Sequence, residues 1–255
     1  MTQVKKFWPI LTGTHKYDKT LSTRNCGHGQ IIEAPILAYL IETSNGRILY
    51  DVGCDYSKIN DPVKRQHYYE NEEFPFGPPS MSEEQKLENR LKQLGLQPLD
   101  IDMVFVGHLH FDHGGGLCDM QHAEIHVHQQ EYEAALEPAD GAYFRDDFSG
   151  DYRWHFQQQE YDLGPCVRAI ESPGHTAGHR PARADTGNTC FPGHCGGAPT
   201  DRFRRARIAG LASRKGAGSG PAGPECRPGA CPGSRRRNEA RTGQAGTSSG
   251  KGGRR

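Results

Sequence analysis

The sequence predicts a mixed α/β (α+β) domain over residues 1–179, followed by a tail of different composition over residues 180–255. Three observations predict the domain: an Asn-Gly signal for a β-hairpin, a capping box ahead of a leucine stripe, and short apolar runs that alternate with helical segments. This alternation is typical of sheets that are covered by helices. About 180 residues are also enough for one domain with a sizeable core.

The predicted strands follow in chain order. Apolar runs at 36–41 and 47–51 flank Ser44-Asn45-Gly46, and Asn-Gly between two such runs is the strongest short-range signal for a hairpin. Further strands are expected, from their apolar and β-branched residues, at 102–107, 123–128 and 167–171.

Two helices are predicted between these strands. Ser82 with Gln85 three positions later has the capping-box pattern, and an apolar stripe at helical spacing follows it (Leu87, Leu91 and Leu94). A second helix is expected at 130–136.

The tail differs sharply from the domain. Residues 180–255 hold 16 basic and four acidic residues, whereas residues 1–179 hold 15 basic and 27 acidic residues. The tail also contains 16 of the 32 glycines and only four large apolar residues (Phe191, Phe203, Ile208 and Leu211). Because so little apolar surface cannot offset the entropy of an ordered chain, we expect the tail to be disordered.

The segment His108-Leu-His110-Phe-Asp112-His113 gathers metal-binding side chains at the end of a predicted strand. Neutral imidazole and carboxylate are ligands that zinc prefers. In an extended segment alternate residues share one side, so His108, His110 and Asp112 are expected to point together. The alternative, surface histidines in a polar loop, accounts poorly for so dense a cluster. Gly114–Gly116 then permit close backbone approach beside the metal.

The spacing H-x-H-x-D-H after a strand resembles the signature of the metallo-β-lactamase superfamily, whose fold is an αββα sandwich. Ile48–Gly53 is similar to the family's first motif, a strand that ends in Asp-x-Gly. Ser172–His179 is similar to its third motif, whose first histidine, here His175, binds metal. Glu33–Ile36 and Leu94–Asp102 look most like the N-acyl-homoserine lactonases, the quorum-quenching branch. Hydrolases of thioesters and other esters share these motifs and remain an alternative.

The resemblance implies a zinc-dependent hydrolase that opens the lactone ring of N-acyl-homoserine lactones. His108, His110 and His175 would bind one zinc ion, and Asp112 and His113 would help to bind a second. The family holds two zinc ions, and we expect one or two here. Water bound to zinc has its pKa lowered from 15.7 to about 7, and the resulting hydroxide would attack the lactone carbonyl.

Three further roles are assigned near this site. Asp112 is expected to be catalytic as well as a ligand. Asp51 would hold a ligand imidazole, with a solvated turn carboxylate as the alternative. Phe111 would contact the acyl chain, with a core aromatic as the alternative. The aromatic-rich insert between Pro138 and Tyr161 is either a lid over the acyl chain or a packed surface loop.

The resemblance covers about residues 1–179. Family members bring a bridging Asp and a final His after the third motif, and the lactonases add a Tyr. The tail has no Tyr, and only Asp201 and His194 lie at loosely similar distances. We therefore expect an incomplete domain that lacks its second β-layer and folds poorly, with greatly reduced or no lactonase activity. We hypothesise that the reading frame departs from that of the family at about His179; a gene whose other frames encode no Gly-Asp and no late His would contradict this.

The other histidines are expected to have structural roles. His126 and His128 share a strand face without a carboxylate cluster beside them, so we assign them to the sheet surface. His179 is expected to be a buried hydrogen-bonding residue. The remaining histidines are expected to be exposed or locally bonded (His15, His28, His67, His122 and His155).

Three function classes are left open: a lactonase-type zinc hydrolase, an inactive truncated or frame-shifted relative, and a protein that binds polyanions through its basic tail. We rank the third last, and do not expect nucleic acid as a partner, because the tail lacks interleaved aromatic residues. The expected partner is a small-molecule lactone or ester. The apolar run at 7–11 is too short for a secretory signal or a membrane span. Eight scattered cysteines favour free thiols, so we expect a cytoplasmic protein with no membrane partner.

Overall fold

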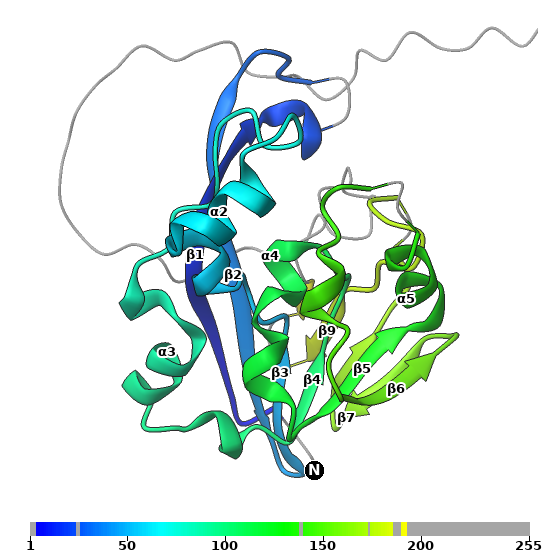
Figure 1. Ribbon diagram of the computed structural model, residues 1–255. Helices are drawn as coiled ribbons and strands as arrows, with labels where there is room; N and C mark the ends of the chain where they lie inside the picture. The colour runs from blue at the N-terminus through cyan, green and yellow to red at the C-terminus, as the bar shows by residue number, and fades with distance from the viewer. Residues whose placement is uncertain (1–3, 24–25, 138–139, 173, 186–189, 193–255) are drawn as a thin grey trace, which may run out of the picture. The chain divides into compact units, whose positions relative to one another are not determined.

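The computed structural model describes residues 4–23, 26–137, 140–172, 174–185 and 190–192 (Figure 1). These residues lie in the first of two compact units, Met1–Ile208, and the second unit, Ala209–Arg255, lies outside the described residues. The predicted disorder of the tail therefore concerns residues that, apart from 180–185 and 190–192, lie outside the described part of the chain.

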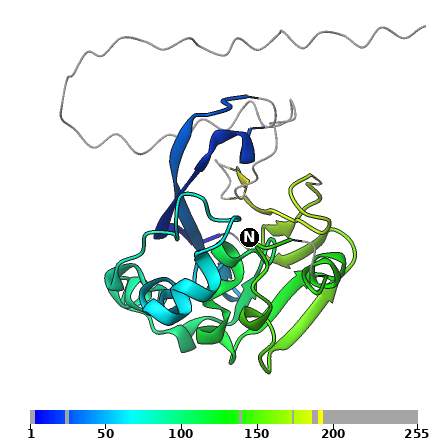
Figure 2. The same cartoon turned by 45° about the horizontal axis from the view of Figure 1, so that its top comes forward.

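The larger sheet has six strands in chain order, with neighbours antiparallel from β1 to β3 and parallel from β3 to β6. β1 and β2 have thirteen residues each and run on past their neighbours (Figures 1 and 2). The predicted hairpin is confirmed, because β2 and β3 pair across Ser44 and Asn45. The strands are β1 (Lys6–Asp18), β2 (Ile31–Thr43), β3 (Gly46–Tyr50), β4 (Met103–Phe105), β5 (Glu124–His128) and β6 (Arg153–Gln157).

The helices are short and connect the strands of the larger sheet. The predicted capping box is present, because the Ser82 N–H donates to Gln85 Oε1 over 2.8 Å. It closes a 3₁₀ turn, and the α-helix itself begins at Leu87. The α-helices are α1 (Tyr56–Asn60), α2 (Pro62–Tyr69), α3 (Leu87–Gln93), α4 (Phe111–Gly114) and α5 (Gln129–Ala135). The 3₁₀ helices are η1 (Lys19–Leu21), η2 (Glu83–Gln85), η3 (Pro98–Asp100), η4 (Gly115–Met120) and η5 (Arg145–Asp147).

A second, antiparallel sheet has four strands in the order β10-β9-β8-β7. The expectation that the second β-layer is missing is therefore wrong. Ala182 and Ala184 are buried while Arg183 and Asp185 are exposed, so β9 keeps the alternation of a strand with one buried face, using the smallest apolar side chain. The described fold thus continues past residue 179. The strands are β7 (Tyr161–Gly164), β8 (Val167–Ala169), β9 (Ala182–Asp185) and β10 (Cys190–Pro192).

Both faces of the larger sheet are buried. On β2, Leu40 belongs to the apolar cluster shared with the helices, whereas Ile41 belongs to the cluster shared with the second sheet. Val104 and Phe105 divide in the same way on β4. The described residues thus form a helix layer and two sheets, three layers of the predicted sandwich. No α-helix follows α5 in the described part of the chain.

The described part of the aromatic insert, residues 140–161, is packed structure, as one of the two alternatives had it. Phe148 and Tyr152 are buried in the core on the helix side of the larger sheet. The insert also supplies β6, an edge strand that we did not predict. The alternation of Trp154 and Phe156 with polar residues was the available signal for it.

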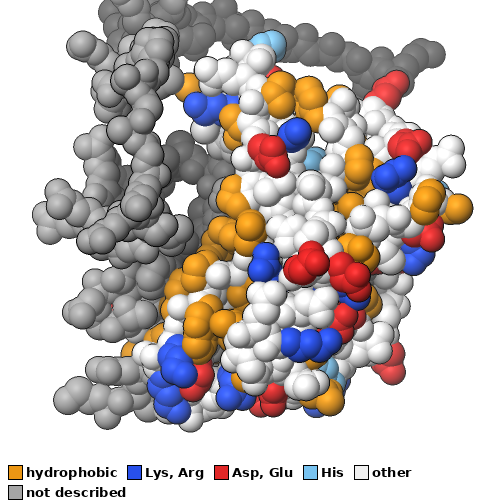
Figure 3. Space-filling view, turned by 90° about the vertical axis from the view of Figure 1, so that its left-hand side faces the viewer, with side chains coloured by type: hydrophobic (Ala, Val, Ile, Leu, Met, Phe, Trp, Pro, Cys, Tyr) orange, Lys and Arg blue, Asp and Glu red, His pale blue; other side chains and the backbone are white. Residues whose placement is uncertain are grey.

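None of the helices in the described part of the chain is both long and apolar enough to cross a membrane. On the face shown in Figure 3, acidic and basic side chains are interspersed. That face therefore lacks the continuous basic stripe that is typical of polyanion-binding proteins.

A buried ion pair joins α1 to the insert. Lys58 Nζ lies 2.5 Å from Asp147 Oδ1, with the two side chains 4% and 3% exposed. Replacing Lys58 by Met leaves the Asp147 carboxylate buried without its cation, so we expect Lys58→Met to lower the free energy of unfolding by about 3–5 kcal/mol. Urea unfolding measures this. Lys64→Met is the matched control, because Lys64 contacts only an exposed hydroxyl, that of Ser57; equal losses in both variants would contradict the prediction.

Candidate metal centre

The candidate site lies where parallel strands end. β3, β4 and β5 are neighbours in the parallel part of the sheet. Asp51 follows β3, the segment 108–113 follows β4, and Glu131 lies just after β5. Ligand sites of α/β sheets form at the carboxyl ends of their strands, since loops from several strands meet there.

The segment after β4 is only partly extended. His108 and His110 flank Leu109, whose side chain is fully buried in the core. Helix α4 begins at Phe111, and the Gly114 N–H donates to His110 O over 2.9 Å. The prediction that Asp112 continues an extended segment is therefore wrong: Asp112 lies in the first turn of α4, which places it beside His113 rather than in line with His110.

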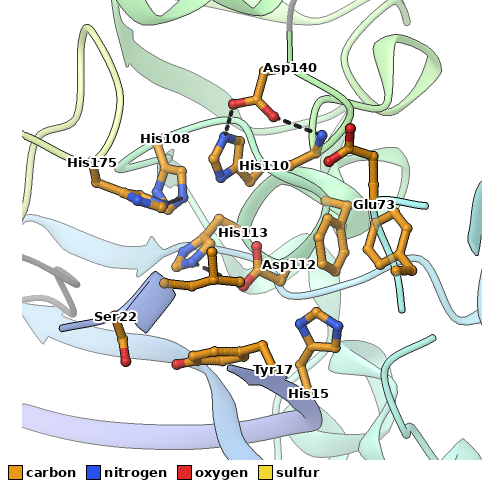
Figure 4. Close-up of a pocket in the computed structure, with 14 residues that line it drawn as sticks. His15, Tyr17, Ser22, Glu73, His108, His110, Asp112, His113, Asp140 and His175 are labelled. Carbon is orange, nitrogen blue, oxygen red and sulfur yellow. Dashed lines mark hydrogen bonds and ion pairs between the residues drawn. The ribbon is translucent and has the colours of Figure 1, made fainter. Parts of the chain in front are cut away.

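The structure brings all five predicted ligands together in two overlapping groups (Figure 4). In the first, His108, His110 and His175 each offer a nitrogen, and these atoms lie within 4.8 Å of one another. Nε2 of His108 and Nε2 of His175 are 3.0 Å apart. The second group, within the same limit, consists of His108, Asp112 and His113.

Two carboxylates contact the imidazoles of predicted ligands. Asp51 Oδ2 lies 2.7 Å from His113 Nδ1, and Asp140 Oδ2 lies 3.2 Å from His110 Nε2. A carboxylate on one ring nitrogen selects the tautomer that leaves the other nitrogen free for a metal. Asp51 is 1% exposed, so it is not a solvated turn residue. Asp140 was missed, because nothing in the insert sequence links it to the histidines.

The charges of the cluster suit a divalent cation. Burial and the neighbouring imidazoles hold the pKa of His108 well below its ordinary value. Burial works to raise the pKa of Asp112, but nearby imidazoles, His113 first, hold it well below its ordinary value. Burial works to lower the pKa of His113, but Asp112 and Asp51 hold it well above its ordinary value. His108 thus presents a neutral imidazole beside the ionised carboxylate of Asp112, and its Nδ1 is buried without a hydrogen-bond partner among the described residues. These residues fit a divalent metal bound by nitrogen and oxygen.

Glu131 ties the loops of the site to one another, and sequence reasoning missed it. Its side chain is fully buried at the start of α5. Oε1 accepts hydrogen bonds from Leu109 N (3.1 Å) and Tyr143 Oη (2.8 Å). Oε2 accepts from Thr176 Oγ1 (2.5 Å) and Gly178 N (3.1 Å). One carboxylate therefore joins the His108–His110 loop, the insert and the third motif.

Beside the histidines lies a pocket of about 360 Å³. The ligand cluster forms one wall, and apolar side chains form part of the rest, including Leu21, Phe74 and Phe111. Phe111 is 6% exposed, and its ring stands 5.1 Å from that of Phe74 in a cluster of aromatic rings. It therefore belongs to the core, as the alternative had it, and also lines the pocket.

The remaining histidines of the strands and the third motif differ in their partners. His179 is buried, and its Nδ1 lies 3.2 Å from Ser172 O, as expected of a hydrogen-bonded residue. His128 Nε2 accepts a hydrogen bond from the buried Arg180. No carboxylate cluster was expected beside His126, and one carboxylate, that of Glu124, approaches it with Oε2 3.8 Å from Nε2. Asp201 and His194 lie outside the described residues.

The sequence model of the metallo-beta-lactamase superfamily matches residues 32–201 of this chain. The chain belongs to this superfamily. The predicted resemblance and fold are confirmed, and the superfamily together with its lactonase relatives supports a metal-dependent hydrolase of the lactonase type.

Individual relatives point to the same branch. An N-acyl homoserine lactonase of a Bacillus species is 30% identical over 72% of this chain and 71% of its own length. An N-acyl homoserine lactonase of Bacillus thuringiensis is 31% identical over 69% of each. Among solved structures, an N-acyl homoserine lactone hydrolase with N-hexanoyl-L-homoserine bound at its catalytic metal centre has a TM-score of 0.64 and 29% identity, over 74% of this chain and 73% of that one.

Glu131→Gln tests the junction of the three loops. The amide nitrogen replaces one accepting oxygen and faces donors, so we expect the free energy of unfolding to fall by about 1–3 kcal/mol. Since the ligand loops lose their support, we expect metal affinity to fall about 10–100-fold. Urea unfolding and zinc titration measure the two effects. Glu133→Gln, in the same helix but exposed, is the control; wild-type metal affinity in Glu131→Gln would contradict the assigned role.

Asp51→Asn tests the carboxylate that holds His113. Asp51 has a φ of 59°, a left-handed conformation that Asn tolerates, so the backbone is expected to persist. We expect affinity for the metal at Asp112 and His113 to fall about 10–100-fold, while the group with His110 and His175 is retained. The zinc equivalents bound per chain measure this. Asp162→Asn, an exposed carboxylate, should bind as the wild type; the same number of equivalents with the same affinities in both variants would rule the role out.

Proposed function

We propose that the protein is a zinc-dependent hydrolase that opens the lactone ring of N-acyl-homoserine lactones. The observation that carries the proposal is the convergence of His108, His110, Asp112, His113 and His175 on one wall of a pocket whose other walls are partly apolar. The lactonase relatives support the substrate class, as does the solved relative that holds a ring-opened product at its metal centre.

The two groups of predicted ligands support two metal positions. His108, His110 and His175 would hold one zinc ion, and Asp112 and His113 a second, with Asp51 and Asp140 fixing the rings of His113 and His110. When bound, zinc supplies a Lewis acid for the carbonyl oxygen and lowers the pKa of water.

Hydrolysis adds water to the lactone carbonyl and breaks the ring C–O bond, which leaves a carboxylate and the hydroxyl of homoserine. The ring oxygen must therefore gain a proton as the bond breaks. Asp112 lines the pocket and is ionised, so its carboxylate can accept the proton of the attacking water and deliver it to the ring oxygen. His113, 3.5 Å from Asp112 Oδ2, orients that carboxylate.

The apolar part of the pocket suits the acyl chain. Phe74, Phe111 and Leu21 line the pocket that also holds the ligand wall. A lactone head against the histidines would thus leave its acyl chain beside aromatic rings, where burial of each CH₂ contributes about 0.8 kcal/mol. Phe111 is the proposed contact nearest the ligands, because Asp112 follows it directly in α4.

The rate of this chain depends on the ligands that the family brings after its third motif. Asp201 and His194 are the candidates, and both lie outside the described residues. We expect turnover well below that of relatives with a complete second site, because the sequence after residue 179 has no Tyr and departs from the pattern of the family. If the chain is instead an inactive relative, we expect no turnover at all.

Zinc-loaded protein is assayed with N-hexanoyl-homoserine lactone, by proton release and chromatography of the opened product. We expect ring opening that a chelator abolishes, and a fall in kcat/KM of about 100-fold or more in Asp112→Asn, because both a ligand and a proton carrier are lost. Asp151→Asn, an exposed carboxylate, should leave kcat/KM unchanged.

Two results would overturn the proposal. A zinc-loaded chain that opens the lactone no faster than buffer is an inactive relative. A higher kcat/KM for the acyclic ester or thioester of the same acyl chain assigns the site to the other hydrolases of the superfamily.

A further inference from the structure

A second group of metal-binding side chains lies away from the candidate centre, on β5 and β6. His126 Nε2 stands 3.8 Å from Glu124 Oε2, and His155 Nε2 stands 3.9 Å from Glu124 Oε1. One potential ligand atom from each of the three residues lies within 4.8 Å of the other two. None of these residues belongs to the five predicted ligands or lines their pocket.

The strand geometry accounts for this convergence. Glu124 and His126 are two residues apart on β5, so they share a face of the sheet. His126 is paired in register with His155 on the parallel strand β6. The two imidazole rings stack with centroids 4.7 Å apart and planes at 5°. Both Nε2 atoms can therefore address the one carboxylate, one through each oxygen.

His126 presents a buried ring nitrogen to this group of side chains. It is 7% exposed, and its Nε2 is buried without a hydrogen-bond partner among the described residues. Its Nδ1 lies 3.1 Å from the hydroxyl of Tyr161 on β7. A hydroxyl that accepts from Nδ1–H leaves the lone pair on Nε2, which is the arrangement around metal-binding histidines. Burial lowers the pKa of His126 to about 4, so the ring is neutral at pH 7.

Glu124 is free to act as the third ligand. Arg153 lies opposite Glu124 in the register of β5 and β6. Its guanidinium donates instead to the carbonyl oxygen of His122. The carboxylate is thus left to the two imidazoles, both too far away for a direct hydrogen bond.

We propose that Glu124, His126 and His155 form a further metal site, which takes a nitrogen-preferring divalent cation such as Zn²⁺. Two imidazoles and one carboxylate favour zinc, cobalt or nickel over magnesium or calcium, which prefer oxygen ligands. The bound ion links the edge strand β6 to β5 and, through Tyr161, braces the neighbouring β7. The site does not depend on the proposed lactonase function, because it shares no residue with the candidate centre.

The test counts metal ions on the full chain. Zinc is titrated calorimetrically into the metal-free wild type, His155→Ala and Glu124→Gln. Both side chains are about half exposed (44% and 45%), so the variants are expected to fold, which unfolding in a chelator verifies. His67→Ala removes an exposed histidine of α2 and is the matched control for adventitious binding.

We expect the wild type and His67→Ala to bind one equivalent more than His155→Ala and Glu124→Gln. Tyr161→Phe should keep that equivalent with an affinity about tenfold lower, because only the support of His126 is lost. Added zinc should raise the unfolding temperature of the candidate-centre variant Asp51→Asn by more than that of Asp51→Asn/His155→Ala, because the group of His108, His110 and His175 is retained in both. Equal stoichiometry and affinity in the wild type, His155→Ala and Glu124→Gln would overturn the site. Loss of lactone opening alone, with this stoichiometry intact, would instead count against the proposed function.

Discussion

The arrangement of the candidate centre depends on one buried carboxylate, that of Glu131. It accepts four hydrogen bonds from three separate segments, and its side chain is fully buried. A buried carboxylate is costly unless its oxygens are satisfied, so the donors must stay where they are. Three of them, Leu109 N, Thr176 Oγ1 and Gly178 N, belong to the segments that carry the predicted ligands. At Gly178 any side chain would collide with Glu131, which is why this approach requires glycine.

Carboxylates lie beside the imidazoles of the site on more than one side. Asp51 and Asp140 stand outside the imidazoles of His113 and His110, and Asp112 stands beside them inside the pocket. The ionised carboxylate of Asp112 lies beside the neutral imidazole of His108, and with Asp51 it holds the pKa of His113 well above its ordinary value against the effect of burial. The buried carboxylates therefore favour a positive charge at the centre, which a divalent metal supplies.

Prediction from sequence worked where the signal is local. The hairpin around Asn45-Gly46 and the capping box at Ser82 depend on neighbouring residues, and both are present. Strand β9 was not expected, because alanine carries little of the apolar signal that marks a strand, although Ala182 and Ala184 fill its inner face. Glu131 could not be recognised, since an isolated glutamate in a helical segment is ordinary until the fold brings its donors to it.

The sequence by itself determined the superfamily and the ligand types, because His108, His110, Asp112 and His113 lie within six residues and ligand chemistry depends on residue type. Only the tertiary structure decided which side chains support them and where else a metal fits. Asp140 reaches His110, and His155 reaches Glu124, across distances in the chain that no local pattern spans. Parallel pairing of β5 with β6 sets the second contact, and register between strands is a property of the whole sheet.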